Sequence, residues 1–195
     1  MRALALQTGP ATEVLSVLDA KAHLRVTTAD EDAYIEALVG ASRTWFEEQT
    51  SRALITQTWD LWLDGWPFAR EIELPRPPLQ TVTSIVYYDQ DDAEATFASS
   101  NYLVDADATI GRVILNATAS WPTTSLRPAK GVRVRFVAGQ GDDVTDVSEI
   151  DRMAVRLLVS HFFELREPMV TGTIISEVPM GLRSIIWRDR AQRTL

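Results

Sequence analysis

The spacing of hydrophobic residues changes twice along this chain of 195 residues. Near both ends the apolar side chains recur at intervals of three or four residues, as they do on one face of an amphipathic α-helix. Between about residues 53 and 140 they alternate with polar side chains, as they do in a half-buried β-strand. The two changes of period predict helical segments at both ends of the chain and a β-rich block between them.

Helix starts are marked by polar residues at the spacing of a capping box. Ser16 precedes Asp19 and Ser148 precedes Asp151, so that a hydroxyl and a carboxylate can satisfy the free amides of a first helical turn. The acids at residues 30–32 favour another start, because the N-terminal end of a helix carries partial positive charge. We expect helices from each of these points.

The helix expected over residues 148–167 carries a broad apolar face. This face comprises Ile150, Met153, Leu157, His161 and Leu165, with Ala154, Leu158 and Phe162. A helix with such a face normally packs it against a core. A short final helix is expected after Pro179.

The β-rich block contains six segments with alternating or β-branched character. They are residues 59–63, 71–74, 82–88, 102–104, 113–115 and 132–138. Segments of this kind pair into antiparallel sheets. The predicted fold class is α+β: a helical bundle formed by residues 1–52 and 145–195, with an inserted antiparallel β-rich domain at residues 53–144.

The charge of the chain argues against a protein that grips nucleic acid. There are 19 Lys and Arg residues against 27 Asp and Glu residues, which gives a net charge of −8 at pH 7. Tight DNA or RNA binding requires an excess of basic side chains that neutralise phosphates. No apolar stretch approaches the roughly 20 residues that cross a bilayer, and the first residues lack the apolar core of a signal peptide. We therefore expect no bulk nucleic-acid binding and no membrane segment.

Residues suited to catalysis or metal binding are few. The chain has no cysteine, and its two histidines, His23 and His161, lack both a second histidine at ligand spacing and a triad partner. Asp105 and Asp107 begin like a calcium-binding loop, but Ile110 occupies the position that requires glycine. The sequence therefore predicts no catalytic residue, no cofactor and no metal site.

The tryptophans leave one enzymatic alternative open. Trp59, Trp62 and Trp66 lie close together in the sequence, and an acidic stretch follows at residues 89–107. Core packing and subunit contacts are one explanation of these tryptophans, since aromatic side chains dominate both. The alternative is a carbohydrate-binding domain or a carboxylate-dependent hydrolase, in which tryptophans stack on sugar and two acids act on it.

The C-terminal segment differs from the rest of the chain in charge. Four arginines oppose a single acid, Asp189, and apolar side chains lie among them. Such a segment can enter a groove on a partner protein, with arginines pairing to carboxylates. It can also pack on its own bundle. The residues expected to bind a partner are Leu182, Arg183, Ile185, Ile186, Trp187, Arg188, Arg190 and Arg193.

Several short segments, in their order along the chain, resemble one protein family. They are residues 19–26, 32–38, 51–59, 73–80, 134–139, 154–167 and 178–181. In these segments the chain resembles the head–tail connector (adaptor) proteins of long-tailed bacteriophages and related gene transfer agents. The resemblance implies a structural protein without enzymatic activity, located in the neck of a virion or phage-like particle and assembled in the bacterial cytoplasm.

The resemblance also implies partners. It implies a ring, twelvefold to match the portal protein, that docks under the portal, links the capsid to the next neck protein (a stopper or head-closure protein) and surrounds DNA without specific binding. The C-terminal residues named above would then bind the portal. Arg133 and Arg135 could pair with Asp91 and Asp92 of a neighbouring subunit, or with acids across their own sheet.

Overall fold

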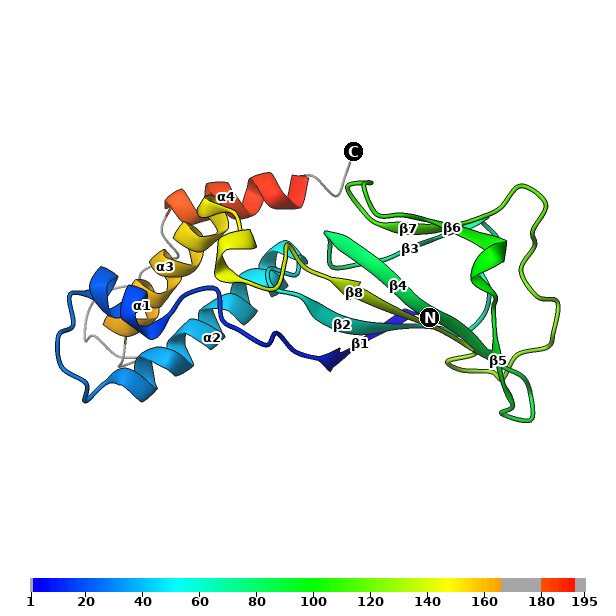
Figure 1. The fold of residues 1–195 in the computed structure, drawn as a ribbon, viewed down its shortest axis with the longest axis horizontal. Coiled ribbons are helices and arrows are strands. Elements are labelled where there is room, and N and C mark those ends of the chain that lie inside the picture. The colour runs from blue at the N-terminus through cyan, green and yellow to red at the C-terminus, as the bar shows by residue number, and fades with distance from the viewer. Residues whose placement is uncertain (1, 166–179, 192–195) are drawn as a thin grey trace, which may run out of the picture. The chain divides into compact units, whose positions relative to one another are not determined.

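The computed structural model describes residues 2–165 and 180–191, and its backbone forms two compact units (Figure 1). The β unit consists of the residues up to Pro10 and Thr56–Gly139. The helical unit consists of Ala11–Ile55 and the described residues from Gln140 onward. The predicted α+β class is confirmed, since helices and antiparallel sheets occupy different units.

The β unit is built on a five-stranded antiparallel sheet in the order β1-β2-β8-β4-β5. The strands are β1 (Arg2–Thr8), β2 (Gln57–Leu63), β4 (Leu79–Tyr88), β5 (Glu94–Thr96) and β8 (Val132–Ala138). In the central strand β8, Val132, Val134, Phe136 and Ala138 are fully buried and alternate with arginines on the other face. The strict alternation of residues 132–138 thus produces a strand with one face in the core.

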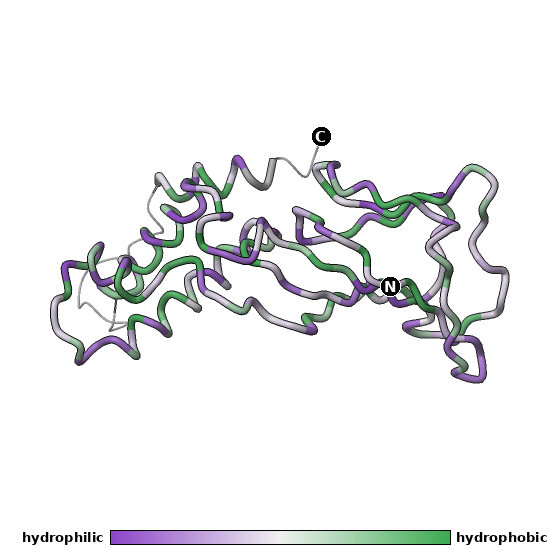
Figure 2. The backbone as a smooth tube through the Cα atoms, in the orientation of Figure 1, coloured by the Kyte–Doolittle hydropathy of each residue, from purple (hydrophilic) through white to green (hydrophobic). Residues whose placement is uncertain are grey.

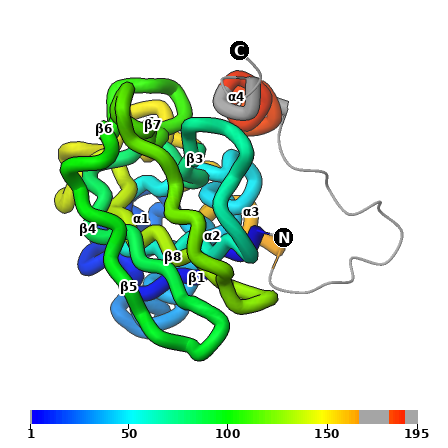
Figure 3. Tube along the Cα trace, turned by 90° about the vertical axis from the view of Figure 1, so that its right-hand side faces the viewer, coloured from blue at the N-terminus to red at the C-terminus, as the bar shows by residue number. Residues whose placement is uncertain are grey.

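A smaller sheet of three strands lies along one side of the larger one (Figure 1 and Figure 3). Its order is β3 (Glu71–Glu73), β7 (Arg112–Leu115) and β6 (Tyr102–Asp105), with a 3₁₀ turn at Ser99–Asn101 before β6. Ile72 and Val113 are buried. Gly111 lies against Leu79, where an added Cβ atom would come within 2.3 Å of that side chain. A glycine is therefore required where the two sheets meet.

Strand β1 corrects the prediction that residues 1–52 belong to the helical part. It pairs antiparallel with β2, with Leu4 opposite Leu61. The sequence of β1 is apolar at Ala3, Leu4, Ala5 and Leu6 without a polar alternation, so its period alone did not identify a strand.

The helical unit contains four α-helices in the part of the chain that the structure describes. They are α1 (Val17–Leu24), α2 (Asp32–Thr50), α3 (Glu149–Glu164) and α4 (Met180–Ala191), with a 3₁₀ turn at Val144–Asp146 before α3. Ala20, Ile35, Phe46, Leu158 and Leu182 contribute to one core from all four helices. Figure 2 shows hydrophobic and hydrophilic residues alternating along α2 and α3, as in helices with one buried face. None of the helices among the described residues is long and apolar enough to span a membrane.

Both predicted capping boxes contain the expected amide bond. The backbone amide of Asp19 donates to Ser16 Oγ at 3.0 Å, and that of Asp151 donates to Ser148 Oγ at 3.2 Å. Ser16 and Ser148 are therefore the N-caps of α1 and α3.

The buried face of α3 differs from the one predicted. Ile150 and Met153, expected in the core, are each 46% exposed. Ala154 and Leu158, predicted on the same face, are buried, and Asp151, Val155 and Val159 are buried with them. The helix has two apolar stripes, and the side that carries an aspartate is the buried one.

Asp151 can be buried because three neighbours satisfy its carboxylate. Gln140 Nε2 donates to Oδ2 at 2.7 Å, Ser148 Oγ donates to the same oxygen at 2.8 Å, and the Arg52 guanidinium lies 3.3 Å away. A buried carboxylate is tolerated only with such partners. The network joins the start of α3 to the segments that follow α2 and β8.

Candidate assembly surfaces

Helix α4 carries most of the residues predicted to bind a partner, but part of it packs on its own unit. Leu182 is fully buried and Ile186 is 8% exposed, both within the core of the helical unit, and Ile185 packs against that core. In this position of α4, Leu182, Ile185 and Ile186 pack on their own unit, whereas the prediction placed them in a groove on a partner.

The opposite face of α4 is exposed. Trp187 is 76% exposed, and Arg183 and Arg188 are exposed beside it in the sequence. The side chain of Arg190 and the whole of Arg193 lie outside the described residues. An exposed tryptophan flanked by arginines is the composition of a protein-binding hot spot. We call Arg183, Trp187 and Arg188 the α4 outer face.

The arginine-rich face of the five-stranded sheet is neutralised within the chain. Arg135 donates to both carboxylate oxygens of Asp60, each at 2.8 Å. Asp60 lies directly opposite Arg135 on the neighbouring strand, and its side chain is only 2% exposed. The hydrogen bond to Asp60 raises the pKa of Arg135 above its ordinary value. Arg135 is therefore the counter-ion of a buried carboxylate.

Two further ion pairs involve residues predicted to meet across a subunit boundary. Arg133 lies 3.6 Å from Glu94, and Asp92 lies 3.1 Å from Arg127. Arg133, Arg135 and Asp92 thus have partners in their own chain, in line with the alternative that these arginines pair with acids of their own sheet. The pairing with a neighbouring subunit stays a prediction. Asp91 is exposed, and its backbone amide donates to Asp89 Oδ1 at 2.9 Å.

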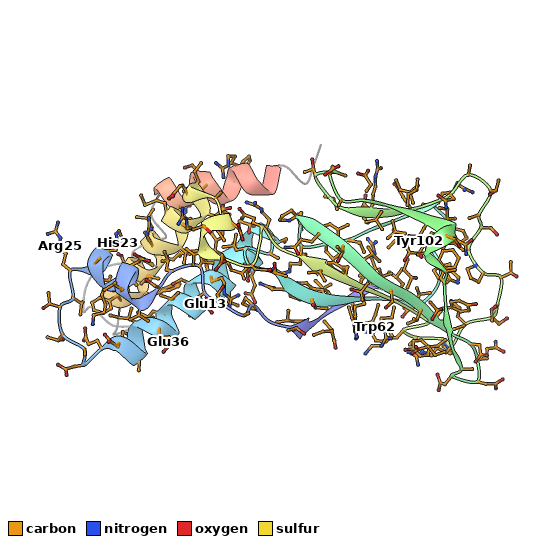
Figure 4. All side chains as sticks on the ribbon, viewed as in Figure 1. Glu13, His23, Arg25, Glu36, Trp62 and Tyr102 are labelled. Carbon is orange, nitrogen blue, oxygen red and sulfur yellow. The ribbon has the colours of Figure 1, made fainter. Side chains whose placement is uncertain are left out.

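The tryptophans of the β unit pack against aromatic and basic side chains. Trp62 stacks on Tyr88 with ring centroids 6.1 Å apart, and the guanidinium of Arg127 lies 4.0 Å from the Tyr88 ring (Figure 4 labels Trp62). Burial, together with the hydrogen bond from its hydroxyl to Glu94, raises the pKa of Tyr88. These cation–π contacts hold the loop that carries Arg127 against the sheet.

A second aromatic cluster connects the loop that follows β2 to other loops of the β unit. Trp66 and Trp121 stack almost parallel, with centroids 4.9 Å apart, and Phe97 contacts both rings. The indole of Trp121 also donates to the carbonyl oxygen of Ala69 at 2.9 Å. Trp62, Trp66 and Trp121 therefore have structural contacts within the β unit.

The two histidines lie on different helices of the helical unit. His23 is exposed on α1 (Figure 4), and His161 is half-buried on α3, with its ring 5.9 Å from that of Phe162. Within residues 2–165 and 180–191, no group of three or more His, Asp or Glu side chains could hold a metal ion.

Comparisons with known proteins agree on one family. Residues 15–110 match the family of phage gp6-like head–tail connector proteins. A chain in the neck of an empty gene transfer agent (GTA) particle is 27% identical, with a TM-score of 0.80 over 96% of this chain and 95% of that chain. No curated protein matches significantly.

Two further structures are similar over the same length. A chain in the virion of a native GTA particle is 26% identical, with a TM-score of 0.78 over 96% of this chain and 94% of that chain. A chain in the neck of a native GTA particle, computed with C12 symmetry, is 26% identical, with a TM-score of 0.74 and the same coverage. The family match and the near full-length structural likeness together support the predicted resemblance to the phage head–tail connector family.

Proposed function

We propose that this chain forms a ring of twelve copies in the neck of a phage or gene transfer agent particle. The ring docks on the portal protein and joins the capsid to the next neck protein around the DNA channel. The observation that carries this proposal is the likeness, over 96% of the chain, to a GTA neck protein. The similar chain in a neck computed with C12 symmetry supports the number of copies.

In this proposal the ring acts by its shape, which encloses the DNA, and by its negative charge, which repels the DNA phosphates. Twelve copies that each carry a net charge of −8 would give the ring on the order of −100 charges. At physiological salt, repulsion of DNA phosphates would extend about 8 Å from the surface. Such a ring encloses DNA and lets it slide.

The α4 outer face supports docking on the portal. Trp187 provides a large apolar anchor, and Arg183 and Arg188 can pair with carboxylates on the portal. Arg190 and Arg193 extend the same basic sequence. Because Leu182 and Ile186 hold the helix on its own core, the anchor can be presented without unfolding α4.

The carbohydrate-binding or hydrolase alternative has little to support it. Trp62, Trp66 and Trp121 pack against neighbouring side chains. Asp60, Asp92 and Glu94 each pair with an arginine.

Native mass spectrometry of the full chain, alone and with the portal protein of the same particle, tests the proposal. We expect twelve copies per portal ring. A chain that stays monomeric with the portal, or a complex with another number of copies, would contradict it.

A further inference from the structure

Helix α3 presents an apolar stripe that lies outside the core formed by the described residues of its unit. The stripe consists of Ile150, Met153 and Leu157, which we call the α3 outer stripe. Ile150 and Met153 are each 46% exposed, and Leu157 is half-buried. None of the three belongs to the core of the helical unit or to the residues packed against it. Adjacent exposed apolar side chains of this size commonly mark a protein contact.

A basic side chain accompanies this stripe. Arg156 is half-buried and lies on the turn between Met153 and Leu157. It makes no ion pair in the described part of the chain, whereas the neighbouring Arg152 is paired with Glu149. The α3 outer stripe therefore combines a bulky apolar surface with a positive charge available to an acidic partner.

Helix α2 presents a surface of the opposite character. Its exposed side carries small residues one helical turn apart, which we call the α2 small face: Ala33, Ala37, Ala41 and Thr44. Two exposed acids border it, Glu36 (Figure 4) and Glu48. Neither of them forms an ion pair within residues 2–165 and 180–191. The α2 small face is shallow and negative.

The two surfaces point away from each other. Helices α2 and α3 pack together through their buried sides, which include Ile35, Val39 and Phe46 on α2 and Val155 and Leu158 on α3. Their outer sides therefore lie on opposite sides of this helix pair. A molecule with complementary patches on opposite sides assembles head to tail, and a closed ring results if the rotation between copies closes.

We propose that the α3 outer stripe of one copy packs on the α2 small face of the next copy around the ring. Small side chains let a facing helix approach closely, so that Met153 and Leu157 fill the space above the alanines. Arg156 meets Glu36 or Glu48 of the neighbour, which fixes the direction of the contact. This inference rests on the proposed ring and names the surfaces that build it.

Cysteine cross-linking tests the contact directly, because the chain has no cysteine of its own. The double variant Met153→Cys, Ala37→Cys is treated with a short flexible bismaleimide, both as the free full chain and on the portal protein. We expect a ladder of covalent oligomers. Each single variant yields no cross-linked oligomer, since like residues do not meet in a head-to-tail contact. Leu18→Cys with Ala37→Cys is the control, because Leu18 is 76% exposed on α1 and outside both surfaces.

A second measurement compares the self-association of variants that carry a charge in one of the two surfaces, alone and mixed. Met153→Glu and Ala37→Glu should each reduce self-association by about tenfold or more, since both place a buried charge in the contact. In a mixture, the α3 outer stripe of the Ala37→Glu variant can still pack on the α2 small face of the Met153→Glu variant. The mixture should therefore form dimers but no rings. Arg156→Glu should weaken assembly, and Glu36→Arg or Glu48→Arg in the same chain should restore it.

The results of these experiments distinguish a failure of the proposed α3–α2 contact from a failure of the proposed ring. If the unmodified chain forms twelvefold rings while Met153→Glu and Ala37→Glu assemble normally, the contact is wrong and the ring stands. Cross-linking of either single variant, which indicates a symmetric contact, also overturns the inference. If the unmodified chain forms no ring even with the portal, the proposed function fails first.

Discussion

At the scale of single residues, the buried charges of this protein have structural partners. Among the described residues the buried acids are Glu47, Asp60 and Asp151, and each is paired with an arginine. The sequence predicted acids across the same sheet as possible partners of Arg135, but it did not predict Arg52 as the partner of Asp151, which lies 99 residues away.

The pair of Asp60 and Arg135 gives an asymmetric prediction. Arg135→Ala leaves a carboxylate that is 2% exposed without its counter-ion, and should lower the free energy of unfolding by about 2–3 kcal/mol. Asp60→Ala should cost less, because the Arg135 side chain is 34% exposed and can turn to water. Urea unfolding measures both variants. Arg133→Ala is the control at about 1 kcal/mol or less, since its pair with Glu94 is at the surface, and equal losses for all three would contradict the argument.

At the scale of elements, a single clear pattern of apolar or capping residues predicted the strand or helix well. A helix with apolar residues on two sides was harder to predict, because the pattern does not say which side is buried. The strand at residues 132–138 and the capped starts of α1 and α3 follow from local signals and are confirmed. The apolar face predicted for α3 was right at Ala154 and Leu158 and wrong at Ile150 and Met153. The helix carries two apolar stripes, and tertiary contacts of Asp151 decide which one is buried. The sequence of α4 likewise has apolar residues on more than one side. It therefore predicted a partner-binding segment, but it did not predict which side of α4 is buried and which is exposed.

The cap of α3 gives the first element-scale prediction. Ser148→Ala removes the acceptor of the Asp151 amide and one of the hydrogen bonds to the buried Asp151 carboxylate. The free energy of unfolding should fall by about 1–2 kcal/mol. Ser160→Ala, at a half-buried position within the same helix, should change it by less than about 0.5 kcal/mol. Chemical denaturation of the two variants compares them, and an equal effect would mean that Ser148 does not act as a cap.

The two sides of α4 should separate stability from portal binding. Leu182→Ala removes a fully buried side chain from the core and should cost about 2–4 kcal/mol of stability. Trp187→Ala removes an exposed ring, so it should change stability by less than about 0.5 kcal/mol while weakening portal binding about tenfold or more. Thermal unfolding and a portal pull-down measure the two effects. Portal binding unchanged in Trp187→Ala, with Arg183→Glu and Arg188→Glu added, would remove α4 from the portal contact.

At the scale of the whole molecule, charge is divided between an acidic body and a basic end. The chain has a net charge of −8, yet Arg183, Arg188, Arg190 and Arg193 oppose one acid near its C-terminus. If those arginines are covered by the portal, the surface left to face DNA is more acidic than the average of the chain. The sequence established this division without any structure, because it depends on composition alone.

The division predicts how assembled rings respond to salt. Full-length rings on the portal should not bind duplex DNA at about 0.15 M salt, and lowering the salt to about 0.01 M should still give no binding, because screening falls and the repulsive field extends from about 8 Å to about 30 Å. A basic surface would behave in the opposite way and bind more tightly as salt is lowered. Fluorescence anisotropy of labelled duplex DNA measures this response, with the unassembled chain as the comparison. DNA binding by the ring that strengthens steeply at low salt would mean that basic side chains line the channel, and the sliding mechanism would then have to be replaced by one in which the neck holds DNA through its phosphates.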